Sequence, residues 1–121
     1  MNLSKTEEQL MKHLWKLEKA FMKDLMDCYD DPKPASTTIA TLLKRMQDKG
    51  YIGFEMDGRA RRYFPKIERQ EYVSGKFQGF VSNFFGDSTS QFASFFTKST
   101  NLTKEELKAL RDIIDNQIEE K

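Results

Sequence analysis

The chain has 121 residues, a formal net charge of +1, and hydrophobic and charged fractions of 38% and 32%, which suit one small domain or a domain with an appended arm. One cysteine and one histidine exclude an intrachain disulfide and a cysteine or histidine cage for a metal. Because long apolar runs and a signal-peptide pattern are absent, we expect a cytoplasmic protein without membrane insertion.

The first predicted helix covers residues 4–18. Ser4 and Glu7 fit a capping box, in which each side chain accepts a hydrogen bond from the other residue's backbone amide. Apolar residues then recur at helical spacing. Trp15 is expected to be buried between this helix and the third helix.

A second, shorter helix is predicted from the apolar residues within 20–29. The segment 30–36 contains two prolines and ends that helix. Ser36 or Thr37 is the expected cap of the helix that follows.

The third helix is predicted over "TTIATLLKRMQDKG", where Gly50 supplies a left-handed stop. Its apolar stripe consists of Ile39, Leu42, Leu43 and Met46. Two β-prone runs, "YIGFEM" and "ARRYFP", follow and are joined by Asp57-Gly58, a strong hairpin signal. Three short helices followed by a hairpin are typical of a winged helix-turn-helix.

The basic side chains are concentrated in the middle of the chain. Residues 33–66 carry 8 basic and 3 acidic side chains, while residues 1–32 and 67–121 each have a net charge of −2. A surface that binds a polyanion is one interpretation. A basic but merely solvated surface is the alternative.

In a winged helix-turn-helix the third helix enters the major groove of DNA and the hairpin follows the backbone. The hydroxyl and methyl groups of Thr37, Thr38 and Thr41 suit base edges or phosphates. The side chains expected to neutralise phosphates are Lys44, Arg45, Arg59, Arg61 and Arg62. Strand alternation predicts Arg59 and Arg61 on one face and Arg62 on the other, with one arginine pairing with Glu55 or Asp57.

The C-terminal region is rich in phenylalanine. A helix is predicted over residues 67–86, then the aromatic segment "QFASFF", then a last helix that opens with a second capping box at Thr103. Seven of the ten phenylalanines lie between Phe77 and Phe96. Such a tail needs a covering surface, and a second copy provides one by symmetry. The expected dimer contacts are Phe77, Phe80, Phe84, Phe92, Phe96, Leu107, Leu110 and Ile114. The alternative is a tail folded back onto the winged domain.

Sequence motifs for catalysis are absent: there is no phosphate-binding glycine-rich loop, no HExxH and no nucleophile with an adjacent base. We therefore expect neither an enzyme nor a metal or cofactor site.

Three stretches, "LSKTEEQLMKHLWKL", "TTIATLLKRMQDKGYI" and "GRARRYFP", followed by "NLTKEELKALRDII", resemble the penicillinase-repressor family of the BlaI/MecI type. The resemblance covers nearly the whole chain. It implies a homodimer with an N-terminal winged helix that binds a palindromic operator and represses transcription. It also implies a membrane sensor protease as a partner, whose signal leads to cleavage at Phe95–Phe96.

The sequence departs from the family pattern at several positions. Phe95 stands where the usual residue before the cleaved bond is Asn, and Ala40 stands where one branch carries a basic residue. Glu8 replaces a frequent tryptophan, which we interpret as a surface variation. The paired cysteines of the copper-responsive relatives are absent from the tail.

We predict a mainly α fold with a small β-hairpin, comprising a winged helix-turn-helix DNA-binding domain at 1–68 and a helical dimerisation domain at 69–121. The function predicted is that of a homodimeric repressor bound to double-stranded operator DNA. The alternatives are a winged-helix protein-interaction module and a regulator that responds to a small molecule.

Overall fold

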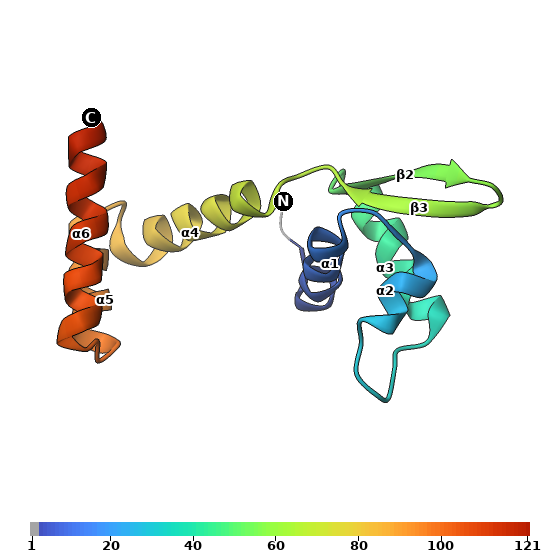
Figure 1. Cartoon of the computed structure of the whole chain (residues 1–121), viewed down its shortest axis with the longest axis horizontal. Helices are drawn as coiled ribbons and strands as arrows, with labels where there is room; N and C mark the ends of the chain where they lie inside the picture. The colour runs from blue at the N-terminus through green and yellow to red at the C-terminus, as the bar shows by residue number, and fades with distance from the viewer. Residues whose placement is uncertain (1–2) are drawn as a thin grey trace. The chain divides into compact units, whose positions relative to one another are not determined.

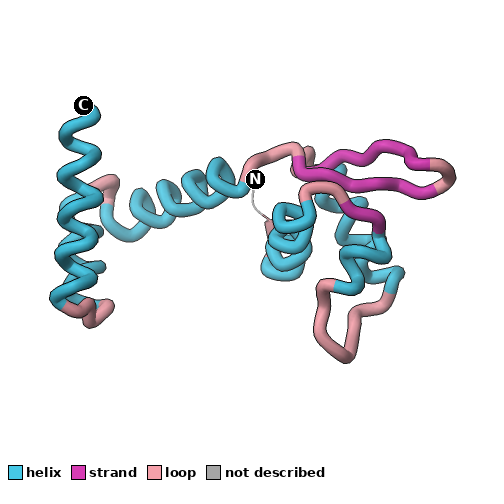
Figure 2. Tube along the Cα trace, in the orientation of Figure 1, coloured by secondary structure: helices cyan, strands magenta, loops and turns pink. Residues whose placement is uncertain are grey.

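The computed structural model describes residues 3–121 as a mainly helical chain with one small sheet (Figures 1 and 2). In chain order the elements are α1 (Lys5–Leu17), β1 (Ala20–Phe21), α2 (Met22–Asp27), α3 (Ser36–Asp48), β2 (Ile52–Asp57), β3 (Ala60–Pro65), α4 (Arg69–Phe85), α5 (Thr89–Ser99) and α6 (Lys104–Glu120). The described residues form two compact units, which we call the head, residues 3–74, and the tail, residues 75–121. The predicted functional division after residue 68 stays a prediction.

The head is built around one apolar core that its helices and sheet share. Leu10 and Leu14 of α1 lie in this core with Leu43 and Met46 of α3, and all four side chains are fully buried. Burying a leucine side chain stabilises a fold by about 2 kcal/mol, so these helices hold one another by their apolar stripes. The stripe predicted for the third helix is confirmed, because all four of its members are buried in α3.

The sheet is antiparallel, with the strand order β1-β3-β2. Strands β2 and β3 form the predicted hairpin, which extends away from the helices of the head (Figure 1). Three helices with this hairpin make a winged helix-turn-helix, and a helical region follows it. The predicted fold class is therefore confirmed.

The hairpin turn differs by one residue from the prediction. Asp57 pairs with Ala60, so the two loop residues are Gly58 and Arg59 rather than Asp57 and Gly58. Gly58 has a φ of +64°, the conformation that a two-residue turn requires at its first position and that glycine adopts without strain. Arg59 consequently lies in the turn and belongs to neither strand.

Two further local predictions are wrong. Ala20 and Phe21, expected in the second helix, form β1 and pair with Tyr63 and Arg62 of β3. The second helix begins only at Met22, where the Asp24 carboxylate accepts a hydrogen bond from the Phe21 amide at 3.0 Å. The N-cap of α3 is Ala35, which has no capping side chain, rather than Ser36 or Thr37.

The capping predictions for other helices are confirmed. The Ser4–Glu7 capping box opens α1, and the Thr103–Glu106 box opens α6. Gly50, with a φ of +85°, follows the end of α3 as the left-handed residue.

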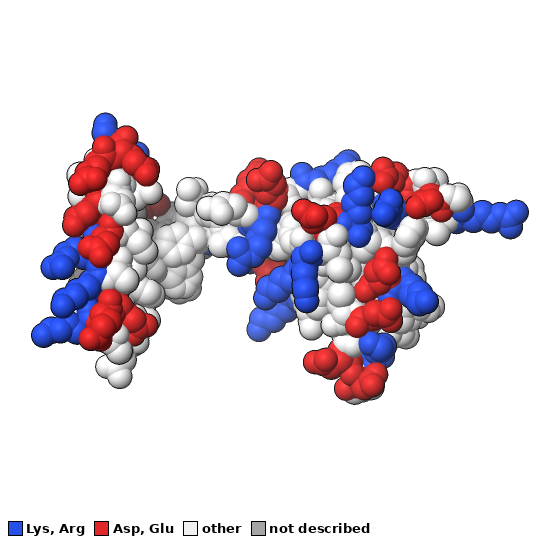
Figure 3. All heavy atoms as spheres, in the orientation of Figure 1, with Lys and Arg blue, Asp and Glu red and all other residues white. Residues whose placement is uncertain are grey.

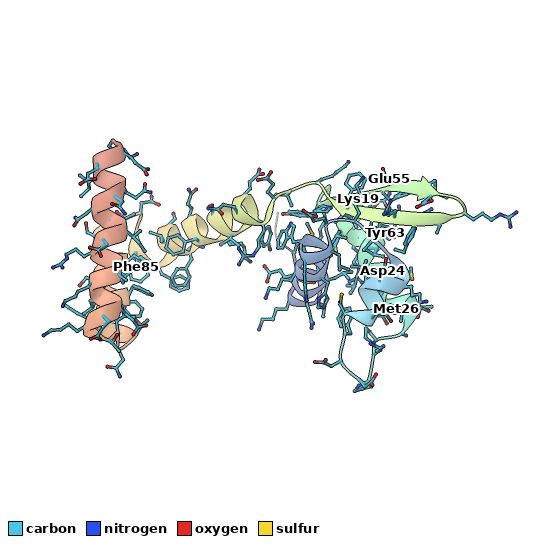
Figure 4. All side chains as sticks on the ribbon, in the orientation of Figure 1. Lys19, Asp24, Met26, Glu55, Tyr63 and Phe85 are labelled. Carbon is cyan, nitrogen blue, oxygen red and sulfur yellow. The ribbon has the colours of Figure 1, made fainter. Side chains whose placement is uncertain are left out.

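The tail exposes most of its apolar side chains. Val81 is the only apolar side chain buried among residues 75–121, and neither α5 nor α6 has a buried residue. The phenylalanines contact one another: the Phe85 ring, labelled in Figure 4, lies 5.6 Å from that of Phe92 and 5.5 Å from that of Phe95. Phe84 is nevertheless 73% exposed. No helix among residues 3–121 is long and apolar enough to cross a membrane.

Candidate nucleic-acid interface

The face of α3 opposite its apolar stripe is polar and open to solvent. The five residues that we predicted for DNA contact on this helix are all exposed: Thr37, Thr38, Thr41, Lys44 and Arg45. Two of them also have partners within the helix. Thr41 Oγ1 donates to the Thr37 carbonyl at 2.9 Å, and Lys44 Nζ lies 3.0 Å from the Asp48 carboxylate in an exposed ion pair. Exposed pairs of this kind contribute little, so Lys44 can exchange its partner at small cost.

The first turn of α3 leaves backbone amides available. The amides of Thr38 and Ile39 donate to the Ala35 carbonyl at 3.0 and 3.2 Å, but no side chain caps the helix. The free amides and the positive end of the helix dipole attract an anion. The sequence predicted a capping side chain at Ser36 or Thr37, so it did not predict these free amides.

The hairpin of β2 and β3, residues 52–65, is the wing of this fold, and its three arginines have different surroundings. The Arg61 guanidinium lies 4.4 Å from the centroid of the Phe54 ring. Arg62 lies on the opposite face, 5.6 Å from the Phe21 ring centroid, with Nη1 3.8 Å from the Asp57 carboxylate. The expected pairing of one arginine across the hairpin is thus confirmed for Arg62. The expectation that Arg59 shares a strand face with Arg61 is wrong, because Arg59 lies in the turn.

The charges of the head are unevenly distributed over its surface. In the view of Figure 3 a basic side chain extends from the free end of the hairpin, and acidic side chains gather around the loop between α2 and α3. On the sheet, Lys19 Nζ and the Glu55 carboxylate form an ion pair at 3.1 Å (Figure 4), so Glu55 is not the partner of a wing arginine.

A buried carboxylate holds the end of α3 against α1. Glu7 is 1% exposed, and its Oε1 accepts hydrogen bonds from Lys49 Nζ and from the Ser4 amide, both at 2.8 Å. Burial alone would raise the pKa of Glu7, but the hydrogen bonds from Lys49 and Ser4 outweigh it and lower the pKa. Sequence reasoning identified Glu7 only as a capping residue. Its bond to Lys49 spans 42 positions and leaves no local signal.

The start of α4 is attached to α1 through Tyr72. The Tyr72 hydroxyl donates to the Glu8 carboxylate, so the interpretation of Glu8 as a surface variation is wrong. Burial, and then this bond, raise the pKa of Tyr72. Trp15 is half-buried and its Nε1 donates to the Ile67 carbonyl at 2.9 Å. Its ring packs against Tyr72, at 5.8 Å between centroids, which corrects its expected place between the first and third helices.

In the tail, α5 and α6 enclose an apolar groove of about 390 Å³. Five of the predicted dimer residues line it: Phe92, Phe96, Leu107, Leu110 and Ile114. The other three, Phe77, Phe80 and Phe84, are exposed on α4. The bond expected to be cleaved, Phe95–Phe96, lies inside α5.

Within residues 3–121 no group of three histidine, cysteine, aspartate or glutamate side chains is placed to hold a metal ion. The helices and the hairpin of the head define a winged-helix protein, and its third helix has one polar, solvent-exposed face. The family model of the penicillinase repressor matches residues 3–116, and the chain therefore belongs to the penicillinase repressor family.

Characterised relatives support this assignment. The chain is 25% identical to the penicillinase repressor of Bacillus licheniformis over 114 residues, which cover 93% of this chain and 89% of the relative. It is 22% identical to the methicillin resistance regulatory protein MecI of Staphylococcus aureus (strain N315), over 95% of this chain and 94% of the relative. Members of this family are transcriptional regulators and not enzymes, and this chain is a transcriptional repressor of the BlaI/MecI type.

Proposed function

We propose that two copies of the chain bind a palindromic operator, with α3 in the major groove of each half-site and the wing on the backbone. The observation that carries the proposal is the α3 face, where three threonines, Lys44 and Arg45 are all exposed beside an uncapped helix start. Threonine hydroxyls and methyl groups match base edges, and the basic side chains and free amides match phosphates.

The wing arginines have separate parts in this proposal. Arg59, in the exposed turn, and Arg61, supported by Phe54, neutralise phosphates. Arg62 is already paired with Asp57 and packed on Phe21, so its contribution to DNA binding is the smallest of the three.

In this proposal the tail is the part of the chain that binds the second copy. Its groove between α5 and α6 and the exposed phenylalanines of α4 are apolar surfaces that one symmetric partner would cover. Two joined heads gain affinity because binding of the second head becomes intramolecular. A chain that ends at Phe85 is therefore expected to sediment as a monomer and to lose operator affinity by about 100-fold or more.

We extend the proposal to regulation by a membrane sensor protease that leads to cleavage at Phe95–Phe96. A cut there would separate Phe92 from α6 and so divide the groove between two fragments. Because the bond lies within a helix, α5 has to unwind locally before a protease can reach it. Phe96→Pro would disrupt α5 as well as recognition of the bond by the protease. Phe95→Asp changes only the residue before the bond, so it is the better variant for testing cleavage.

The test of operator binding is the selection of genomic fragments by the full-length chain, followed by gel-shift titrations with the selected fragment and a random duplex. With about five phosphate contacts per subunit, the logarithm of the affinity should fall with the logarithm of the salt concentration at a slope of about −9. Arg61→Ala should weaken binding to both duplexes equally, whereas Thr38→Ala should change the preference between them.

Lys108 is an exposed basic residue of the tail. Lys108→Ala is therefore the matched control for the arginine variant and should leave the affinities for both duplexes unchanged. Equal losses for Thr38→Ala and Arg61→Ala on both duplexes would contradict the division between base and phosphate contacts. Failure of the chain to bind any duplex at low salt would favour a protein-interaction module instead.

A further inference from the structure

Tyr72, in the first turn of α4, is the last buried residue of the head. It is 8% exposed, its hydroxyl donates to the Glu8 carboxylate, and its ring lies 5.8 Å from that of Trp15 and 5.9 Å from that of Tyr51 between centroids. One side chain thus combines a hydrogen bond to a carboxylate with two aromatic contacts. These interactions restrain the start of α4 in direction as well as in position.

The same part of α1 also holds the end of α3. Glu7, next to Glu8 in the chain, accepts the hydrogen bond from Lys49, the C-cap residue of α3. Two consecutive glutamates therefore fix two different helices: Glu7 fixes the end of the helix that we propose enters the groove, and Glu8 fixes the start of α4. Within the head, the first turn of α4 is in this way held in a defined direction relative to α3.

Beyond Tyr72 the helix has no other buried residue for more than two turns. All eight residues from Val73 to Phe80 are exposed. Two of them are glycines, and a Cβ added at Gly75 or Gly79 would meet no atom within 4 Å. The head therefore does not pack against α4 between Val73 and Phe80, and Tyr72 is the last residue through which the head can orient this helix.

We infer that Tyr72, held by Glu8, is a positioning residue that determines which spacing of half-sites the dimer accepts. The inference rests on the proposed function. In a two-fold dimer the heads reach both half-sites at once only at the matching separation and rotation. A free α4 start lets the heads turn, so that several spacings are bound with similar affinity. A fixed start restricts binding to one spacing.

The experiment compares full-length chains on operators in which the half-sites are moved together or apart by one or two base pairs. A shift of two base pairs turns one half-site by about 70° around the duplex. The wild-type chain should lose about tenfold in affinity or more on shifted operators. Tyr72→Phe, which keeps the ring and removes the hydroxyl, should lose about threefold or less.

Other variants test the bond itself. Glu8→Ala should behave as Tyr72→Phe does, and the double variant should be no different from either single one, because all three lack the same bond. Glu8→Gln retains an oxygen that accepts from the tyrosine and should restore much of the spacing preference. Tyr29→Phe removes a hydroxyl elsewhere in the head and is the matched control. Affinity for a duplex with a single half-site should be equal in the wild type and all five variants.

A second measurement needs no DNA. In a chain with Cys28→Ser and Lys23→Cys, a spin label on the new cysteine marks each head once. Pulsed electron resonance should give a narrow distribution of distances between the two labels of a dimer. Adding Tyr72→Phe should broaden that distribution.

Three results are decisive. An unchanged spacing preference and label distribution in Tyr72→Phe would overturn the inference while leaving the proposed function intact. An equal loss on every operator, including the single half-site, would assign Tyr72 to the stability of the head and also overturn it. A wild-type chain that binds no operator at any spacing would refute the proposed function itself.

Discussion

Leu10 in the head is fully buried, whereas Phe84 and Ile118 in the tail are 73% and 65% exposed. The two units differ in where their apolar side chains lie. In the head, helix stripes and the sheet meet in one core. In the tail, the rings contact one another along α4 and α5 and remain open on their other sides. The head therefore has a core of its own, whereas the tail leaves an apolar surface that the proposed second copy would cover.

The two units can therefore be compared most directly by measuring how the stability of each depends on protein concentration. Unfolding of a self-contained core does not depend on concentration, whereas a fold completed by a second chain becomes more stable as concentration rises.

The largest effect is expected in the core of the head. Leu43→Ala removes a fully buried side chain and should lower the free energy of unfolding by about 3 kcal/mol, because of lost burial and a residual cavity. Urea unfolding at two protein concentrations should give the same loss. Leu17→Ala, at an exposed position of α1, is the control and should cost about 1 kcal/mol or less. Similar losses for both variants would argue against the core described here.

The buried ion pair between α1 and α3 should give the next largest effect. Lys49→Met leaves the Glu7 carboxylate buried without its cation and should cost about 2 kcal/mol. Glu7→Gln should cost less, because Lys49 is one-third exposed and can be solvated. Equal losses in the two variants would show that the carboxylate is not desolvated as described.

The same pair predicts a dependence on pH. The pKa of Glu7 is lower in the folded chain than in an unfolded one, where it is about 4.3. The contribution of Glu7 to the free energy of unfolding is therefore complete above the unfolded pKa, and it is lost as pH falls through the lower, folded pKa. Wild type should lose more stability than Glu7→Gln between pH 5 and pH 3, in urea titrations at both ends of that range. Parallel losses would contradict the lowered pKa.

In the tail, Phe84→Ala should act on association rather than on folding. Loss of one ring from the proposed interface should weaken the proposed dimer by about tenfold, or about 1.4 kcal/mol. Sedimentation over a concentration series measures this shift, and the stability of the head should not change. Lys98→Ala is an exposed, polar control in α5. If Phe84→Ala dimerises as well as wild type, Phe84 is not part of the interface.

The smallest effect is expected at Glu18, which ends α1 with φ +69° and ψ −47°. The Lys19 amide donates to the Leu17 carbonyl at 2.8 Å, which makes this a γ-turn of the strained form. Glu18→Gly should stabilise the head by about 0.5–1 kcal/mol, since glycine adopts positive φ freely. Glu18→Ala removes the side chain without relieving the backbone and should give no gain. Calorimetry on both variants would separate strain from side-chain effects.

The sequence predicted those parts of the fold that depend on local periodicity. The stripes of α1 and α3, the hairpin and the capping boxes at Ser4 and Thr103 are encoded within one or two turns of chain. Strand β1 was missed because two residues carry no periodic signal, and they become a strand only by pairing with β3. The turn shifted by one residue because the register is fixed by the facing strand and not by the Asp-Gly pair alone.

The candidate site was predictable to a similar extent. The exposure of Thr37, Thr38 and Thr41 followed from the position of the apolar stripe. The bonds from Glu7 to Lys49 and from Tyr72 to Glu8 join residues 42 and 64 positions apart, and no spacing rule relates such pairs. The support of Arg61 by Phe54 likewise needed the strand register.

The contact between Arg61 and Phe54 has a consequence for the thermodynamics of DNA binding. A free arginine loses up to about 2 kcal/mol of rotamer entropy when it is immobilised. The contact with the Phe54 ring already restricts the rotamers of Arg61, whereas Arg59 in the turn keeps its rotamer freedom until it binds a phosphate. Two arginines two positions apart would thus form similar contacts at different entropic cost. In calorimetric titrations, Arg59→Ala should make the binding entropy less unfavourable, and Arg61→Ala should alter mainly the enthalpy.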